Sequence, residues 1–349
     1  MAKDPENEAR KRALNRIRKT RNRADFDAES WAMSLASGDR SVLARAISLV
    51  ESRKAEDRPK VAQLLSALPA PPSPTMRYGV TGVPGVGKST WIEAAGMALI
   101  RRGHKVAVLA VDPSSQRTGG SMLGDKTRMN VLSRQQEAFV RPSPAGDALG
   151  GVGRATAETL RLCEAAGFDR ILIETVGVGQ SETEVRSMTD VFLLLMLPGG
   201  GDGVQGIKRG ILEWADLVLM NKADGPEEQR LRAEEALSAY RGAMTLMQPP
   251  AHGDAPILGT TSGLDATDVE QWVTRIEDRL SHALDTGLWS ERRLAQYRSA
   301  LEQQLNRDIL SATKEKPEFQ AAWTRLQTEL ERTQIPPYDV IRQLLKDLL

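Results

Sequence analysis

The chain has 349 residues, of which 40% are hydrophobic and 27% charged, and its formal net charge is +1. These values are ordinary for a globular protein, and the balanced charge gives no electrostatic reason to expect nucleic acid or a membrane as a partner. A single cysteine excludes an intrachain disulfide framework and favours a reducing, cytoplasmic setting. The longest strongly apolar run, VFLLLML at 191–197, is too short to cross a bilayer.

The N-terminal region is basic at first and then helical. Its first 25 residues are rich in Arg and Lys and lack the apolar segment of a secretory signal, so we expect either a solvated tail or a basic contact surface. Apolar residues then recur at helical spacing from Trp31 to Leu68, and Asp39 can cap a helix after the SGD break. The run PAPPSP at 69–74 predicts a linker, which makes residues 1–75 an N-terminal helical extension.

Residues 76–285 are predicted to form one α/β domain. Apolar runs alternate there with helical stretches such as 90–102 and 154–166. The runs are buried strands, expected at 76–81, 105–111, 170–174, 191–197, 216–221 and 256–260. This alternation predicts a mostly parallel sheet between helices.

The strand pattern ends after about residue 285. Three apolar stripes separated by prolines then predict three helices, marked by Leu294, Tyr297, Leu301, Leu305 and Ile309, by Phe319, Trp323, Leu326 and Leu330, and by Ile341, Leu344 and Leu348. These stripes need a partner surface. Residues 286–349 are therefore expected to form a helical arm that packs either on its own α/β domain or on a second copy of the chain.

GVPGVGKST at 82–90 lies between a predicted strand and a predicted helix, and it satisfies the pattern G-x-x-x-x-G-K-[ST]. Glycines let backbone N–H groups turn toward phosphates at the positive end of a helix. Lys88 can reach the β- and γ-phosphates, and the Ser89 hydroxyl can bind Mg²⁺. The predicted nucleotide-binding residues of this loop are Gly82, Val83, Pro84, Gly85, Val86, Gly87, Lys88, Ser89 and Thr90.

Two carboxylates, Asp112 and Glu174, stand at the ends of predicted strands. The carboxyl ends of parallel strands meet at the edge of the sheet where ligands bind, and Mg²⁺ prefers oxygen ligands. We therefore expect both carboxylates near the metal, although an acidic residue at a strand end can also be a simple cap.

NKAD at 221–224 follows a predicted strand and selects the base. Asp224 can accept two hydrogen bonds from guanine, whereas adenine offers no such donor pair and would leave the carboxylate unpaired. The Lys222 stem can lie along the base, and Asn221 can tie the loop to its neighbours. After the next strand, TTSG at 260–263 supplies small donors for guanine O6 from Thr261, Ser262 and Gly263. The nucleotide is therefore predicted to be GTP.

Three glycine-rich loops, at 112–129, 175–182 and 198–210, leave predicted strand ends near the nucleotide. Each could be an ordinary surface loop. A γ-phosphate with Mg²⁺ can also order such loops, and hydrolysis then releases them, which makes a switch.

Five motifs in order resemble the methylmalonyl-CoA mutase-associated GTPases of the MeaB/ArgK type, over roughly residues 30–349. They are GVPGVGKST, DPSS…TGGSMLGDKTRM, ETVGVGQSE, PGGGDGVQGIKRG and NKAD. The resemblance implies a P-loop GTPase core with N-terminal helices and a C-terminal dimerisation arm. It also implies an adenosylcobalamin-dependent acyl-CoA mutase as partner, for which GTP hydrolysis gates cofactor delivery and protects or reactivates the enzyme.

Residue roles follow from the same resemblance. It implies that Lys88 and Ser89 serve phosphate and Mg²⁺ and that Asn221, Lys222 and Asp224 bind guanine. Asp112, Asp125 and Glu174 are implied to lie around the metal. Residues 199–208 resemble an extra switch loop whose active member is Lys208, so the expected catalytic residues are Lys88, Glu174 and Lys208.

Two points stay open beside the resemblance. No water-positioning glutamine is evident, and Gln180 and Glu174 are the candidates. In the stretch 141–152, Ala145, Gly146 and Asp147 stand where relatives often carry a basic residue, so a partner contact there is not assigned.

Other functions fit the residues less well. A nickel or zinc metallochaperone GTPase needs clustered soft or imidazole ligands, but the chain offers Cys163 and three scattered histidines, His104, His252 and His282. A P-loop kinase acting on a transport protein is opposed by NKAD, which argues against ATP. A pure scaffold is opposed by the intact phosphate loop.

Overall fold

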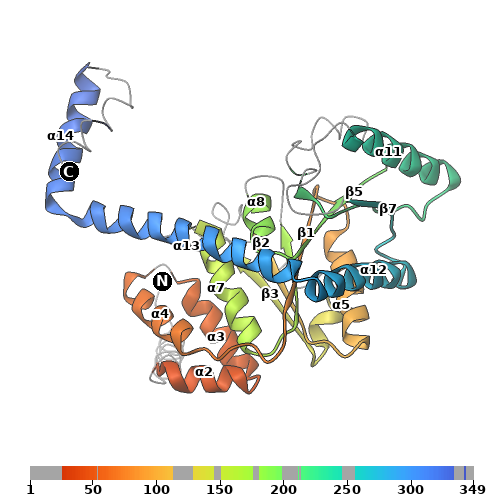
Figure 1. The fold of residues 1–349 in the computed structure, drawn as a ribbon, viewed down its shortest axis with the longest axis horizontal. Helices are drawn as coiled ribbons and strands as arrows, with labels where there is room; N and C mark the ends of the chain where they lie inside the picture. Colours follow the sequence, from red (N-terminus) through yellow and green to blue (C-terminus); the bar gives the residue numbers. More distant parts are fainter. Residues whose placement is uncertain are drawn as a thin grey trace, which may run out of the picture. The chain divides into compact units, whose positions relative to one another are not determined.

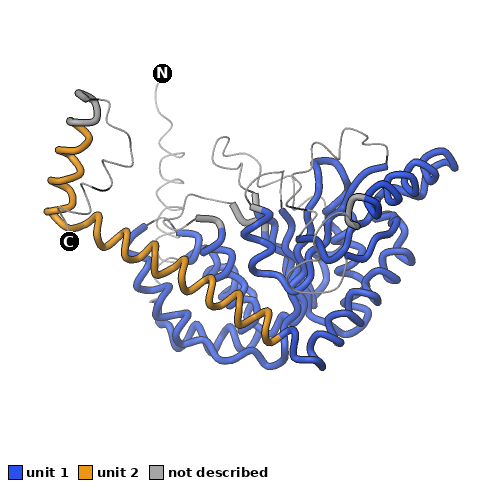
Figure 2. The backbone as a smooth tube through the Cα atoms, turned by 45° about the horizontal axis from the view of Figure 1, so that its top comes forward, with its two compact units in different colours: residues 1–289 blue, residues 290–349 orange. Residues whose placement is uncertain are grey.

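The computed structural model describes residues 26–52, 54–112, 129–144, 151–175, 181–198, 211, 214–245, 256–333 and 342. The chain divides into two compact units, residues 1–289 and residues 290–349 (Figure 2). The predicted division of the first unit at residue 75 stays a prediction.

A seven-stranded sheet in the order β3-β2-β4-β1-β5-β6-β7 forms the centre of the first unit (Figure 1). Every neighbouring pair is parallel. The strands are β1 (Met76–Gly82), β2 (Val106–Asp112), β3 (Ala138–Pro144), β4 (Arg170–Thr175), β5 (Val191–Met196), β6 (Leu217–Met220) and β7 (Ile257–Thr260). This sheet confirms the predicted fold class, and six of its strands coincide with predicted ones.

Side chains alternate between the two faces of the sheet, which gives each face its own core. On one face, α5 (Lys88–Arg101) and α12 (Ala266–Asp285) share a buried cluster with Val80, Val108 and Leu172. On the other face, α7 (Gly151–Ala165) and α8 (Ser181–Arg186) share a cluster with residues such as Leu109 and Ile173. α11 (Glu227–Thr245) follows β6 and contributes Ala233, Leu237 and Tyr240 to the second cluster.

Close packing at the centre depends on one glycine. Gly79 of β1 pairs with Ile173 of β4 and Phe192 of β5. A Cβ atom at this position would lie 2.5 Å from Cδ2 of Phe192, so the ring covers the strand only because residue 79 has no side chain.

The N-terminal helices α2 (Ala28–Ala36), α3 (Arg40–Val50) and α4 (Arg58–Ala67) belong to the same core as α7. Asp39 caps α3 as predicted, because its side chain accepts from the amides of Ser41 and Val42. The Arg141 guanidinium of β3 lies 2.6 Å from the Glu51 carboxylate. These helices therefore pack on α7, and this ion pair joins the end of α3 to β3. Two short 3₁₀ helices, Ala55–Asp57 and Leu132–Arg134, complete the described elements of the first unit.

Helix α13 (Leu288–Glu315) begins in the first unit and continues into the second, where α14 (Pro317–Thr333) follows. In α14, Phe319, Ala322 and Leu326 are buried. In α13, by contrast, every residue of the predicted stripe is at least 50% exposed: Leu294, Tyr297, Leu301, Leu305 and Ile309. The third predicted stripe lies outside the described residues. No described helix combines the length and apolarity needed to span a membrane.

Candidate functional site

The loop between β1 and α5 has the backbone of a phosphate-binding turn. Gly82, Gly85 and Gly87 all have positive φ angles, of 147°, 76° and 99°. A Cβ at Gly82 would lie 2.3 Å from the Leu195 carbonyl oxygen, and one at Gly87 would lie 2.7 Å from Nδ2 of Asn221. The conformation therefore requires glycine, and it leads directly into the N-terminus of α5, where backbone N–H groups favour an anion.

Lys88 is the first residue of α5, and its side chain is buried inside the loop. Its Nζ donates to the carbonyl oxygens of Gly82 at 2.7 Å and Val83 at 3.3 Å. The ammonium group therefore contacts two carbonyl oxygens at the place where the motif puts the phosphates, and a charged phosphate oxygen is a stronger acceptor than a carbonyl oxygen.

Ser89 and Glu174 meet where the phosphate loop faces β4. Strand register places Glu174 beside Val80 of β1. The Ser89 hydroxyl donates to Oε1 of Glu174 at 2.8 Å, and Glu174 is only 4% exposed. A hydroxyl and a carboxylate form the hard oxygen set that Mg²⁺ prefers, so these two residues fit the predicted metal.

The other predicted metal and switch residues are less fully described. Asp112 ends β2, whose Val111 pairs with Thr175 of β4, so its backbone reaches the same edge of the sheet as Glu174. The side chain of Asp112 lies outside the described residues, as do Asp125, Gln180 and Lys208 in full. Most of the three glycine-rich loops, together with residues 145–147, lies outside as well, and the roles assigned there stay predictions.

Asn221 connects the phosphate loop to the loop after β7. Its Nδ2 donates to the Val86 carbonyl at 2.8 Å, and its Oδ1 accepts from the Gly263 amide at 2.8 Å. Lys222 donates from Nζ to the Gly85 carbonyl at 2.9 Å, so two neighbouring residues hold the phosphate loop from one side. Both ends of the predicted nucleotide site are therefore one hydrogen-bonded structure.

Lys222 has an unusual backbone, with a φ angle of 61°. A non-glycine residue in the left-handed region is uncommon and often marks a functional site. Gln229, in the first turn of α11, supports this turn by donating from Nε2 to the Lys222 carbonyl at 2.8 Å. The next polar residue of the motif, Asp224, is exposed and can face a ligand.

The first three amides after β7 already have acceptors on neighbouring elements. Thr261 N donates to the Met220 carbonyl, Ser262 N to Asp268, and Gly263 N to Asn221, each at 2.8 Å. The next amide, that of Leu264, makes no hydrogen bond to any residue that the structure describes, and Leu264 is 83% exposed. The Leu264 amide is therefore a further candidate donor for guanine O6, and the roles expected of Thr261, Ser262 and Gly263 stay predictions.

Sequence reasoning missed three residues of this site: Gln229, Leu264 and Asp268. Gln229 and Asp268 lie in the first turns of the helices that follow the two base-side loops. Polar residues are common in such turns, so only the folded structure distinguishes these two as supports of a loop.

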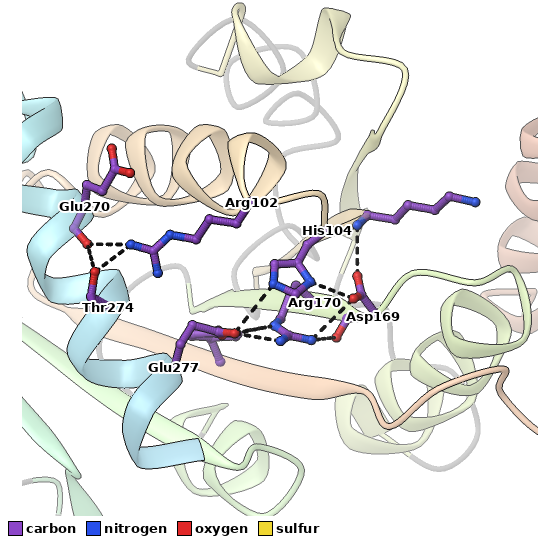
Figure 3. Close-up of polar contacts among 9 residues, drawn as sticks. Arg102, His104, Asp169, Arg170, Glu270, Thr274 and Glu277 are labelled. Carbon is purple, nitrogen blue, oxygen red and sulfur yellow. Dashed lines mark hydrogen bonds and ion pairs between the residues drawn. The ribbon is translucent and has the colours of Figure 1, made fainter. Parts of the chain in front are cut away.

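A second polar cluster lies at the opposite, amino edge of the sheet and holds α12 there (Figure 3). The Arg170 guanidinium lies 2.6 Å from the Glu277 carboxylate of α12, which also accepts from the Tyr78 hydroxyl. His104 contacts Asp169 through Nδ1 at 2.7 Å. Burial raises the pKa of Glu277 to about 7, with the Asp278 charge adding to the rise.

Comparison with known proteins shows which family the chain belongs to. The family model described as methylmalonyl Co-A mutase-associated GTPase MeaB matches residues 43–318. The chain is 41% identical over 310 residues to the GTPase ArgK of Escherichia coli, covering 89% of this chain and 93% of that one. It is 39% identical over 324 residues to the mitochondrial methylmalonic aciduria type A homolog of Caenorhabditis elegans, covering 90% and 81%.

A solved structure agrees over most of the chain. The crystal structure of LAO/AO transport system kinase is 34% identical, with a TM-score of 0.71, and the match covers 93% of this chain and 98% of that one. With the family match and the phosphate loop described above, these likenesses confirm the resemblance that the motifs predict. The chain belongs to the methylmalonyl-CoA mutase-associated GTPases named MeaB, and it is a GTPase that binds guanine nucleotides.

Proposed function

We propose that this GTPase is a chaperone of an adenosylcobalamin-dependent acyl-CoA mutase. GTP hydrolysis would gate delivery of the cofactor and protect or reactivate the mutase. The family description supports the association with a mutase. The observation that best supports a nucleotide cycle is a pair of hydrogen bonds from the Asn221 side chain, one to Val86 and one to Gly263. They join the loop proposed to bind the phosphates to the loop proposed to bind the base.

At the phosphate end, Lys88 is proposed to exchange its carbonyl partners for oxygens of the β- and γ-phosphates. Ser89 and Glu174, with Asp112 and Asp125, are proposed to hold Mg²⁺. The metal would neutralise charge that develops on the transferred phosphoryl group. Glu174 also stays a candidate for orienting the attacking water, beside Gln180.

At the base end, Asp224 is proposed to accept from N1–H and the 2-amino group of guanine, while the Leu264 amide donates to O6. The Lys222 stem is proposed to lie along the base, in line with its contact to Gly85 at 2.9 Å. Together these groups explain a preference for guanine over adenine, whose edge cannot satisfy the carboxylate.

The switch is proposed to lie in the loops that leave β2, β4 and β5. These strands end at Asp112, Thr175 and Met196, at the edge that carries the phosphate loop. Lys208, in the loop after β5, is the proposed active member that adjusts hydrolysis when the mutase binds. A switch of this kind is consistent with slow intrinsic GTP hydrolysis that becomes faster when the partner binds.

We propose that the chain acts as a homodimer in the cytoplasm. The exposed stripe of α13 recurs every three or four residues over four turns, as a helix interface requires. A second copy offers the same stripe, so the contact can be self-complementary. The lone cysteine, Cys163, is buried and free, which suits a reducing compartment.

Co-purification tests the partner. The full chain is used as bait in an extract of its native cells, with GDP or a non-hydrolysable GTP analogue, and mass spectrometry identifies what is retained. We expect a B12-dependent mutase whose retention differs between the two nucleotides, and the purified mutase should raise GTP turnover. If no such mutase is retained in either state, the chaperone proposal fails while the GTPase assignment stands.

A further inference from the structure

We propose that Asp268 is a positioning residue for guanine recognition, and that it sets the loop from Thr261 to Leu264 against the base. This inference rests on the proposed placement of guanine beside Asp224. Asp268 belongs to none of the sequence motifs and lies in the first turn of α12.

A single oxygen of Asp268 holds two parts of the loop. Oδ2 accepts from the Thr261 hydroxyl at 2.7 Å and from the Ser262 amide at 2.8 Å. Because the acceptor is a carboxylate, each bond is stronger than one between neutral groups. A side chain and a backbone group of adjacent residues are thereby fixed to one atom, which leaves the loop little rotational freedom.

The helix that carries Asp268 is itself rigidly held. The Trp272 indole donates to the Thr260 carbonyl at 3.0 Å, which joins α12 to the end of β7. Farther along α12, Glu277 is bound by Arg170 at the amino edge of the sheet (Figure 3). Asp268 therefore transmits the position of a fixed helix to the loop, as a supporting residue of a binding site must.

The position of the loop reaches both ends of the nucleotide site. Gly263 follows Ser262 directly and donates to Asn221, which in turn contacts the phosphate loop. With the Ser262 amide held by Asp268 and the Gly263 amide held by Asn221, the two peptide units that precede Leu264 are both anchored. Room for adjustment is small, because a Cβ at Gly263 would already lie 3.2 Å from the Trp91 amide nitrogen.

Asp265 serves as a control that separates a role in guanine recognition from a role in helix stability alone. Asp265 is a second acid at the start of the same helix, and its side chain caps α12 through the amides of Thr267 and Asp268 at 2.9 and 3.2 Å. The Thr261 hydroxyl and the Ser262 amide donate to Asp268 Oδ2 and not to the Asp265 carboxylate. Loss of Asp265 weakens the helix end, and loss of Asp268 should in addition release the loop.

The test compares D268A, D268N and D265A in the full-length chain by calorimetric binding of GDP, inosine diphosphate (IDP) and ADP. We expect D268A to weaken GDP and IDP binding equally, by about tenfold to a hundredfold, because both bases carry O6. ADP binding should not change. D268N keeps an acceptor oxygen and should recover most of the affinity, while D265A should stay within about threefold of wild type.

Kinetics provide the second readout. D268A should raise KM for GTP while kcat at saturation stays within about twofold, because Asp268 acts on binding of the base and not on phosphoryl transfer. Equal losses in D268A and D265A, or a GDP affinity in D268A equal to that of wild type, would overturn the inference. A wild-type chain that binds ADP as tightly as GDP would instead overturn the guanine site itself, which separates the two failures.

Discussion

Both edges of the sheet are rich in charged side chains, but these side chains have different bonding partners at the two edges. At the carboxyl edge, Lys88 is held by backbone carbonyls and Asp224 is exposed. At the amino edge, charged groups pair with each other or with buried amides: Arg77 lies 2.6 Å from Glu164, and Asp190 accepts from the Arg77 amide at 2.7 Å. Lys88 and Asp224 lie in the loops where the nucleotide is proposed to bind, whereas these groups at the amino edge bond to other residues of the chain.

We therefore expect the carboxyl edge to serve nucleotide binding and the amino edge to serve the stability of the fold. Variants at the carboxyl edge should lose nucleotide or turnover while the chain stays folded. Variants at the amino edge should change the free energy of unfolding and leave the site intact in the folded fraction. Each prediction below tests one side of that division.

The largest expected effect is on turnover in K88A. Loss of the ammonium group removes the charge that faces the transferred phosphoryl group, so kcat for GTP should fall by at least about a thousandfold. K105A is the matched control, because Lys105 is an exposed lysine at the amino edge, before β2. Steady-state phosphate release measures both. Turnover retained in K88A would refute its assignment as the catalytic lysine.

A smaller effect, on GDP affinity, is expected when Gly87 is replaced by alanine. In G87A the added Cβ would meet Asn221 at 2.7 Å with φ at +99°, so GDP affinity should fall by roughly tenfold or more. G103A is its control, because Gly103 has φ at +88° but nothing within 4 Å of an added Cβ. G103A should lose about 1 kcal/mol of stability and keep its affinity. Equal affinities in the two variants would contradict the contact between Asn221 and the phosphate loop.

The smallest expected effect is a pH dependence at the amino edge. The pKa of Glu277 is about 7 in the folded chain against an ordinary value of 4.5, so folding favours its protonated form. That contribution to stability is complete below pH 4.5, declines as the pH rises toward 7 and is lost above it. Since the Arg170 pair favours the ionised form, we expect a loss of only about 1 to 2 kcal/mol.

Denaturant unfolding of wild type and E277Q between pH 4.5 and 7.5 measures this decline as a difference. Contributions that are common to both proteins cancel in this difference. E270Q, at a partly exposed position on the same helix, should follow wild type, because the Arg101 hydrogen bond lowers the pKa of Glu270 and keeps it ionised over this pH range. If E277Q shows the wild-type slope, Glu277 is not the group that titrates.

The sequence predicts most of this fold because its signals are local. Continuous apolar runs predict six strands, and Asp39 is recognisable as a cap. The missed strand, β3, has only three apolar residues before Arg141, and Pro142 and Pro144 argue against a strand. Prolines are tolerated there because β3 is an edge strand, with β2 as its one neighbour. Edge position depends on the order of strands in space, which local patterns do not encode.

In the candidate site, too, local signals are readable from the sequence and contacts between distant residues are not. The phosphate loop and NKAD are contiguous motifs, so their residues could be named from the sequence. Asp268 and Gln229 gain their importance from contacts with residues on other elements, whereas the Leu264 amide is notable because it makes no hydrogen bond within the part of the chain that the structure describes. The sequence indicated small donors at 260–263, but it could not show that the amides of Ser262 and Gly263 already have acceptors within the chain.

A crystal structure of the full chain with a non-hydrolysable GTP analogue and Mg²⁺ tests the central claim most directly. We predict the triphosphate in the loop from Gly82 to Ser89, with Lys88 Nζ moved from its carbonyl partners to phosphate oxygens. The guanine should bond to Asp224 and to the Leu264 amide. An analogue bound elsewhere, or a base that leaves Asp224 without a contact, would contradict the account.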